Sequence, residues 1–268
     1  MSLNLTSSNK VVISVIHLPP LPGSPGFKGA LEDLIGFGVK NAKILEETGF
    51  DAIIIENFGD KPYLVRVRNP LTIASMTVIV REVIRSVNIP IGINLLRNSG
   101  LEALAIAYAT GALFIRVNAY CQPLWSVEGF LEPLAPKIER LRARIVKDIK
   151  ILADANVKHS WPIGSPTIRY IVRECCERAK LDAIIVTGSR TGEAPLIEEV
   201  LEVREESRVP IIIGSDMTAE NLSSYWGLAD GFIVGSYIMS NGIAGNPIDS
   251  QRAERFMKKV RELRLISY

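Results

Sequence analysis

Charged side chains stand at the ends of several apolar runs of this chain, where a buried strand would leave the core. Glu56 ends one run, Arg116 interrupts a second, and Asp154 and Lys158 lie near the end of a third. An unpaired charge buried in such a strand costs several kcal/mol, so a series of them needs a shared purpose. Opposite charges in one pocket compensate one another and shift each other's pKa values, as general acid–base groups require.

We therefore expect these four residues and His17 to be catalytic. Glu56 or Asp154 is the expected general base or acid, and His17 is its proton partner. Arg116 and Lys158 are expected to stabilise developing negative charge. Lys158 has two further interpretations: it forms a Schiff base if it is desolvated, or it neutralises Asp154.

A proline-rich segment, residues 17–25, begins at His17 and holds four prolines. The prolines stiffen the segment and lower the entropy that it would lose on closing over a ligand. A lone histidine is more often a structural residue, and the segment also suits a polyproline ligand or a plain rigid turn. Its position directly after a buried strand disfavours the exposed polyproline ligand.

Further polar and small residues lie beside the same strand ends, and we expect them to bind substrate. They are Asn57, Asn94, Asn118, Asn156, His159, Thr187, Gly188, Thr191, Gly192 and Asp216. A single polar residue at a strand end is more often a cap or a solvated loop residue, so the prediction depends on the whole group. The segment 187–195 suits a loop that covers a phosphate, or a simple surface loop.

Two small-residue pairs near the C-terminal end of the chain predict a phosphate site. They are Gly214-Ser215 and Gly235-Ser236, which follow the last two expected strands. Barrels often bind phosphate with these two loops, where backbone N–H groups and a helix start favour an anion. Glycine is also merely convenient in turns.

A divalent metal is compatible with the carboxylate and imidazole ligands that Glu56, Asp154, His17 and His159 offer. No His-Glu-x-x-His motif or other short ligand spacing marks these residues. A glycine-rich dinucleotide motif and a Walker A loop are also absent from the sequence. We expect no other cofactor.

The chain alternates short apolar runs with amphipathic segments from end to end. The expected strands are Val11–Ile16, Asp51–Ile55, Ile89–Leu95, Leu113–Val117, Lys150–Ala155, Ala183–Val186, Pro210–Ile213 and Gly231–Val234. The expected helices lie near Ala30–Thr48, Leu71–Ser86, Gly100–Thr110, Pro136–Arg144, Thr167–Lys180, Leu196–Glu206, Ala219–Trp226 and Asp249–Arg264. This pattern predicts an α/β fold, a (β/α)8 TIM barrel formed by residues 1–268 as one domain. An open doubly wound sheet would alternate in the same way, but eight strands without a second-domain signal favour closure.

Two segments fall outside the repeating pattern. Residues 1–10 are expected to be a flexible N-terminal segment. Residues 119–147 form the longest connection, and we expect a lid or a subunit contact there, because loops of that length are uncommon unless they have a function.

Composition narrows the class of protein. A net charge of +2 argues against nucleic-acid binding by phosphate neutralisation. No run of about 18 apolar residues predicts a transmembrane helix, and no secretory signal is recognisable. Cys121, Cys175 and Cys176 show neither a disulfide framework nor a metal-ligand spacing, so we expect a reducing, cytoplasmic compartment.

The motifs taken together resemble the BtpA family over nearly the whole chain. The stretches that carry the resemblance are Val15–Ser24, Ile55–Asp60, Ile115–Asn118, Asp154–His159, Thr187–Gly192, Gly214-Ser215 and Gly235-Ser236. The resemblance implies a barrel similar to phosphate-binding (β/α)8 enzymes. The family takes its name from a photosystem I biogenesis factor that associates peripherally with the thylakoid. Other members look like sugar- or nucleoside-metabolism proteins and occur where no photosystem exists.

We expect an enzyme that acts on a small phosphorylated sugar or nucleoside-like molecule, as a lyase, an isomerase or a nucleosidase-like hydrolase. The main rival is a non-catalytic assembly factor for a membrane complex, with peripheral membrane association. A third alternative is a sugar-phosphate sensor that binds without turnover. A homo-oligomer is expected on general grounds, because such barrels often pair through their helical faces.

Overall fold

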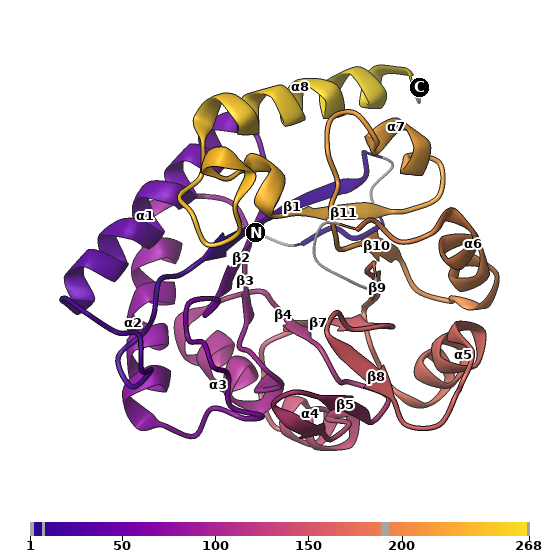
Figure 1. The fold of residues 1–268 in the computed structure, drawn as a ribbon, viewed down its shortest axis with the longest axis horizontal. Coiled ribbons are helices and arrows are strands. Elements are labelled where there is room, and N and C mark those ends of the chain that lie inside the picture. Colours follow the sequence, from indigo (N-terminus) through magenta and orange to yellow (C-terminus); the bar gives the residue numbers. More distant parts are fainter. Residues whose placement is uncertain (1–2, 7–8, 189–192, 267–268) are drawn as a thin grey trace.

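Eight parallel strands close into a barrel in the computed structural model, which describes residues 3–6, 9–188 and 193–266 (Figure 1). Around the barrel the strands follow the order β1-β11-β10-β9-β7-β4-β3-β2. Their bounds are β1 Val11–His17, β2 Ala52–Glu56, β3 Ile91–Asn94, β4 Phe114–Val117, β7 Lys150–Asp154, β9 Ala183–Val186, β10 Ile211–Ile213 and β11 Gly231–Val234. The predicted single-domain TIM barrel is therefore confirmed, with a strand in each of the eight expected places.

Helices form a ring outside the barrel (Figure 1). Their bounds are α1 Leu31–Thr48, α2 Pro70–Ser86, α3 Gly100–Thr110, α4 Ala135–Arg142, α5 Ile168–Arg178, α6 Ile197–Glu206, α7 Leu222–Tyr225 and α8 Ser250–Ile266. The C-caps of α1 and α3 are Gly49 and Gly111, both with φ of 93°. Glycine adopts this left-handed conformation without steric cost. Two short 3-10 helices, η1 Ser236–Ile238 and η2 Ser240–Gly242, precede α8.

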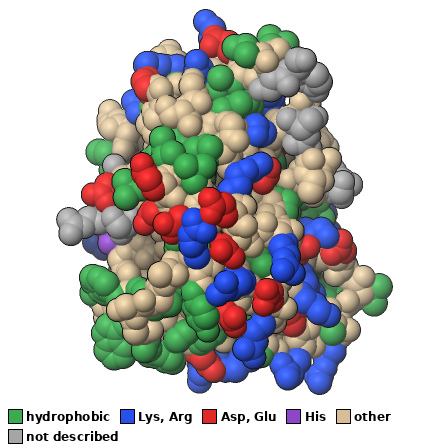
Figure 2. Space-filling view, turned by 90° about the vertical axis from the view of Figure 1, so that its right-hand side faces the viewer, with side chains coloured by type: hydrophobic (Ala, Val, Ile, Leu, Met, Phe, Trp, Pro, Cys, Tyr) green, Lys and Arg blue, Asp and Glu red, His purple; other side chains and the backbone are tan. Residues whose placement is uncertain are grey.

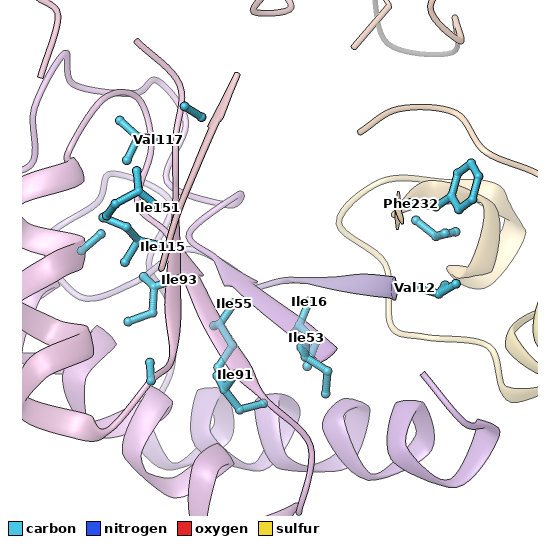
Figure 3. Packing of buried hydrophobic residues seen from close by; sticks show 14 of the residues in the cluster. Val12, Ile16, Ile53, Ile55, Ile91, Ile93, Ile115, Val117, Ile151 and Phe232 are labelled. Atoms are coloured by element: carbon cyan, nitrogen blue, oxygen red, sulfur yellow. The ribbon is translucent and has the colours of Figure 1, made fainter. Parts of the chain in front are cut away.

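Side chains alternate between the two faces of each barrel strand. This alternation decides which side chain at the end of a strand points into the barrel. On β2, Ile53 and Ile55 pack in the layer between strands and helices, as Figure 3 shows. Ala52 and Ile54 belong instead to the cluster inside the barrel. Because the period of a strand is two residues, Glu56 continues the inward-facing series and emerges at the barrel mouth.

The barrel interior is filled with side chains. Phe114 is fully buried there, and a Cβ atom at Gly92 on the neighbouring strand would collide with its ring. Leu3 and Leu5 pack against the same interior cluster and are only 8% and 7% exposed. These two leucines of the segment 1–10 therefore gain apolar burial by packing against the barrel.

A small antiparallel sheet adds to the barrel and was not expected from the sequence. It has the order β6-β5-β8, with β5 Leu124–Ser126, β6 Gly129–Leu131 and β8 Ser160–Pro162. β5 and β6 form a hairpin within the long connection 119–147. We call these three strands the accessory sheet. One face carries the exposed aromatic residues Trp125, Phe130 and Trp161.

A disulfide bond joins Cys121, which precedes the hairpin, to Cys175 in α5. Their Cα atoms lie 5.4 Å apart, although 54 positions separate them in the sequence. The expectation that the cysteines form no disulfide is therefore wrong. Short-range spacing rules do not detect a pair that only the closed barrel brings together. Cys176 is a free cysteine.

None of the helices within the described residues combines the length and the apolar character that crossing a bilayer requires.

Candidate active site

A cavity of about 450 Å³ opens at the carboxyl ends of the barrel strands. We call it the inner cavity. The four charged residues that the sequence singled out all line it, although they come from three strands and one loop: Glu56, Arg116, Asp154 and Lys158. In TIM barrels this end of the strands carries the catalytic groups.

Glu56 is the centre of a row of three polar residues at the mouth. His17, Glu56 and Asn94 are register partners on β1, β2 and β3. Asn94 Nδ2 donates to Glu56 Oε2 at 2.7 Å, and His17 Nε2 lies 3.6 Å from Glu56 Oε1. Glu56 is only 6% exposed. One carboxylate oxygen is thus held by an amide, while the other faces an imidazole.

The protonation state of His17 follows from its surroundings. Its Nδ1 accepts the backbone N–H of Gly245 at 3.1 Å, and its ring stacks on Phe58 with centroids 4.1 Å apart. Burial lowers the pKa of His17, and Glu56 opposes this shift without reversing it. A neutral imidazole whose Nδ1 is an acceptor carries its proton on Nε2, so His17 presents a donor toward Glu56.

Asp154 forms the second buried cluster. Its side chain is fully buried and accepts from Arg116 Nε at 3.1 Å, from Arg116 Nη2 at 3.3 Å and from Asn118 Nδ2 at 2.7 Å. Burial raises the pKa of Asp154, while Arg116 and Asn118 pull it down. Burial opposes the charge on Arg116, but Asp154 and Glu56 outweigh it and raise the pKa of Arg116. The guanidinium therefore stays charged and holds the carboxylate in place.

Lys158 pairs with a different carboxylate from the one that the sequence suggested. Its Nζ donates to Asp216 Oδ2 at 2.9 Å, so neutralisation of Asp154 falls to Arg116 instead. Asp216 follows β10 and adopts a φ of 53°. The side chains of Lys158 and Asp216 are 22% and 14% exposed, which leaves both accessible from the cavity.

The two glycine–serine pairs line the inner cavity, but they differ in what their side chains do. A Cβ atom at Gly214 would collide with Ile185, so packing alone explains that glycine. Ser215 Oγ is occupied, because it accepts the N–H of Gly188 at 2.7 Å and donates to a carbonyl oxygen. A Cβ atom at Gly235 would meet only His17 Cε1, at 3.9 Å. The free space beside the backbone in this part of the inner cavity therefore lies at Gly235 and Ser236.

Several residues expected to bind substrate hold the framework together. Asn57 Nδ2 donates to Asp60, and its Oδ1 accepts the N–H of Leu96. Asn156 exchanges hydrogen bonds with the backbone of Thr187, whose hydroxyl donates to the Asn156 carbonyl oxygen. Both amide groups are therefore committed to loop contacts.

The remaining expected substrate-binding residues have different locations. Asn94, Asn118, His159 and Asp216 line the inner cavity. Asn118 Oδ1 is buried without a hydrogen-bond partner in the described part of the chain. Gly188 lines a neighbouring cleft. Thr191 and Gly192 lie outside the described residues.

Sequence reasoning missed five cavity-lining residues in the loops after β2 and β3: Phe58, Lys61, Tyr63, Leu96 and Arg97. No strand-end rule selects positions this far into a loop. Tyr63 donates its hydroxyl to the Phe58 carbonyl oxygen at 2.7 Å, and burial raises the pKa of Tyr63. Arg97 donates to the Lys158 carbonyl oxygen. Next to Phe58, the Gly59 N–H donates to the Leu18 carbonyl oxygen of the proline-rich segment.

A second and larger space of about 1250 Å³ adjoins the inner cavity. We call it the outer cleft. Five residues line both spaces: Lys61, Tyr63, Arg97, Val157 and His159. The hairpin β5–β6 and α5 contribute its other walls. The long connection, for which the sequence suggested a lid or a subunit contact, thus borders the mouth of the site.

Among the residues that the structure describes, no group of three or more His, Cys, Asp and Glu side chains is placed to hold a metal ion. The carboxylates of Glu56 and Asp154 are instead paired with amide, imidazole or guanidinium groups.

Comparison with known proteins gives a family match. The sequence model of the BtpA family matches residues 8–262. An uncharacterized protein of Pyrococcus abyssi is 42% identical over 256 residues, which is 96% of this chain and 98% of that protein. The photosystem I biogenesis protein BtpA of Synechocystis is 36% identical over 252 residues, 94% of this chain and 88% of that protein.

Solved structures resemble the fold at low sequence identity. Phosphoribosyl anthranilate isomerase of Thermus thermophilus aligns with a TM-score of 0.58 at 13% identity, over 94% of this chain and 99% of that one. N-acetylmannosamine-6-phosphate 2-epimerase of Clostridium perfringens aligns with a TM-score of 0.56 at 16% identity, over 88% and 91%. These structures show that the fold is shared.

Proposed function

This chain belongs to the BtpA family, and we propose that it is an enzyme acting on a small phosphorylated sugar or nucleoside-like molecule. One observation carries the proposal. Charged groups from β2, β4 and β7 meet in one cavity, and that cavity also reaches the small residues after β10 and β11. Burying Glu56 and Asp154 together at the barrel mouth costs free energy, and an active site there supplies a reason for that cost.

In the proposed mechanism Glu56 is the general base. Asn94 holds Glu56 Oε2, so Oε1 is the oxygen left to take a proton from the substrate. His17 carries a proton on Nε2, 3.6 Å from that oxygen, and donates it as general acid to another substrate atom. Protonated Glu56 then returns a proton to Nε2, which restores both groups. Such paired proton transfer serves lyases, isomerases and nucleosidase-like hydrolases alike.

Lys158 and Arg116 contribute positive charge in this proposal. Lys158 reaches the cavity with its ammonium group and stabilises negative charge that develops on the substrate. Arg116 acts through Asp154, whose carboxylate it fixes by two hydrogen bonds. Asn118 Oδ1, which lacks a partner in the described part of the chain, is an acceptor suited to a substrate hydroxyl.

Gly235 and Ser236 are the proposed phosphate site. The missing side chain at Gly235 leaves room for an anion to approach the backbone. The names of two similar folds, phosphoribosyl anthranilate isomerase and N-acetylmannosamine-6-phosphate 2-epimerase, denote enzymes of phosphorylated compounds. Loops after the last two strands commonly hold phosphate in this architecture.

The test is a ligand screen followed by a matched pair of variants. Phosphate, sugar phosphates and nucleoside monophosphates are expected to raise the melting temperature of the wild-type protein. Ser236→Asp is expected to abolish this shift by repelling the anion, whereas Ser236→Asn, of similar size and without the charge, should keep most of it. The proposal fails if no phosphorylated compound stabilises the wild type, or if the two variants behave alike.

A second candidate, an assembly factor, is favoured by the name of the Synechocystis relative and by the exposed aromatic face of the accessory sheet. Seen from the side of α5 and α6, hydrophobic side chains gather at one lower edge of the molecule (Figure 2). Under this function Trp125→Ser would abolish partner binding, while Glu56→Gln would leave it intact.

A further inference from the structure

The outer cleft has a wall of a different kind from the inner cavity. Leu124 and Val127 from the hairpin, Trp161 from β8 and Ile171 from α5 give it a largely apolar lining. Trp161 keeps 61% of its surface exposed although it lies in this wall. An exposed aromatic side chain at a concave, largely apolar cleft suits the stacking of a flat ring.

Two side chains with hydrogen-bond acceptors interrupt the apolar wall. Glu128 lies in the turn of the hairpin, and its Oε2 has no hydrogen-bond partner among the described residues. Arg97 Nε is 3.7 Å from this oxygen, close enough for charge attraction but too far for a hydrogen bond. Gln122 donates its Nε2 to the Ala155 carbonyl oxygen. Its Oε1 is therefore the acceptor, and it too is buried without a partner in the described ranges.

We propose that the outer cleft binds a planar nitrogen heterocycle with amino or ring N–H donors, such as an amino-bearing nucleobase. This inference rests on the proposed function, because the heterocycle is the second half of the substrate whose phosphate the inner cavity holds. The ring stacks on Trp161, and its donors pair with Glu128 and Gln122. The terminal torsion of a glutamate is broad, so Glu128 can turn either oxygen to the ligand.

The junction between the two spaces supports a single ligand that spans them. Lys61, Arg97 and His159 line both the inner cavity and the outer cleft. A ligand with its phosphate at Ser236 and its ring at Trp161 would pass these shared residues, and its linking sugar would lie in the inner cavity that Glu56 and Lys158 also line.

Guanosine and inosine test the acceptor pair, because they differ only in the 2-amino group. Isothermal titration of the full chain is expected to show guanosine binding about tenfold more tightly than inosine. In Glu128→Gln this preference should fall to near unity, since one acceptor oxygen is replaced by a donor. Glu132→Gln is the matched control, because Glu132 follows the same hairpin and its side chain is 55% exposed.

Trp161 and Trp125 test the stacking. They are direct partners across β8 and β5, but only Trp161 lines the outer cleft. Trp161→Leu is expected to weaken guanosine binding about tenfold, and Trp125→Leu should leave it unchanged. Circular dichroism of both variants separates a loss of binding from a loss of fold.

The outcomes distinguish this inference from the function on which it rests. If phosphate binds at Ser236 but guanosine does not bind, the inference is overturned and the proposed function stands. An affinity for guanosine that is the same in Glu128→Gln, Trp161→Leu and the wild type would also overturn the inference. If guanosine binds as expected but no phosphorylated compound does, the outer cleft is supported and the phosphate site fails.

Discussion

Glu56 Oε1 and His17 Nε2 are 3.6 Å apart on adjacent strands paired in register. Neither side chain is free to swing, because Asn94 holds the carboxylate and Gly245 with Phe58 holds the imidazole. An acid and a base held this close, but beyond hydrogen-bond distance, can both reach one substrate from the same wall of the cavity. This geometry makes the pair the natural target for mutation.

Glu56→Gln is expected to lower turnover about 100-fold or more on any substrate identified, because an amide cannot accept the proton. The amide preserves size and can keep the contact with Asn94, so the melting temperature should change little. Glu262→Gln on the exposed surface of α8 is the control. Full activity in Glu56→Gln would exclude Glu56 as the base.

The burial of His17 predicts a pH dependence of stability. Its folded pKa is lowered below the ordinary value of 6.5, so the unfolded chain binds the proton more readily. The stability that neutral His17 contributes is present above that value and is lost as pH falls toward the folded pKa. The loss amounts to at most about 1.4 kcal/mol per pH unit.

His17→Asn removes the titrating group and keeps an acceptor for the Gly245 N–H. Urea unfolding at about pH 7.5 and about pH 5 should show a steeper fall for the wild type than for the variant. Parallel pH profiles of the two proteins would mean that the pKa of His17 is not depressed.

The disulfide gives a prediction with a built-in control, since its neighbour is a free cysteine. Denatured, unreduced protein should expose one reactive thiol per chain, and reduced protein three. Cys175→Ser should lower the free energy of unfolding by about 2–4 kcal/mol under oxidising conditions, and Cys176→Ser by less than about 1 kcal/mol. Three thiols without reductant would show that the bond is not formed.

Two glycine-to-alanine substitutions should change the free energy of unfolding in opposite directions. Gly92→Ala forces a methyl group into the ring of Phe114 and should cost about 1–3 kcal/mol. Gly36→Ala lies in α1, where a Cβ atom meets nothing within 4 Å, and should stabilise by about 0.5–1 kcal/mol. Denaturant unfolding of both variants measures the difference, and equal effects would contradict the packing described.

Most of the barrel and part of the candidate site could be predicted from the sequence, and particular residues show the physical reasons. In β2 the run of isoleucines ending in Glu56 predicts both a buried strand and the side on which the carboxylate emerges. The same period places Arg116 and Asp154. By contrast, Asn57 and Asn156 look like ligand-binding amides in the sequence, and only the folded loops reveal that their hydrogen bonds are already used.

Other features depend on contacts between distant segments. Trp161 belongs to a three-residue strand that exists only because the hairpin lies beside it. Cys121 and Cys175 meet only after the chain has passed through β7 and into α5. Residues in loops, such as Arg97, carry no periodic signal at all. Local sequence patterns do not predict such pairings, because only the folded barrel brings the distant segments together.

Side chains fill the barrel interior around Phe114, and Leu3 and Leu5 pack against the same cluster and close the far end of the barrel. Among the described residues, the inner cavity therefore opens at the carboxyl ends of the strands, and the accessory sheet lies beside that opening. If a substrate is split in the inner cavity, the product nearer the opening has to dissociate before the deeper product can leave. Product departure in a fixed sequence would then be imposed by the architecture itself.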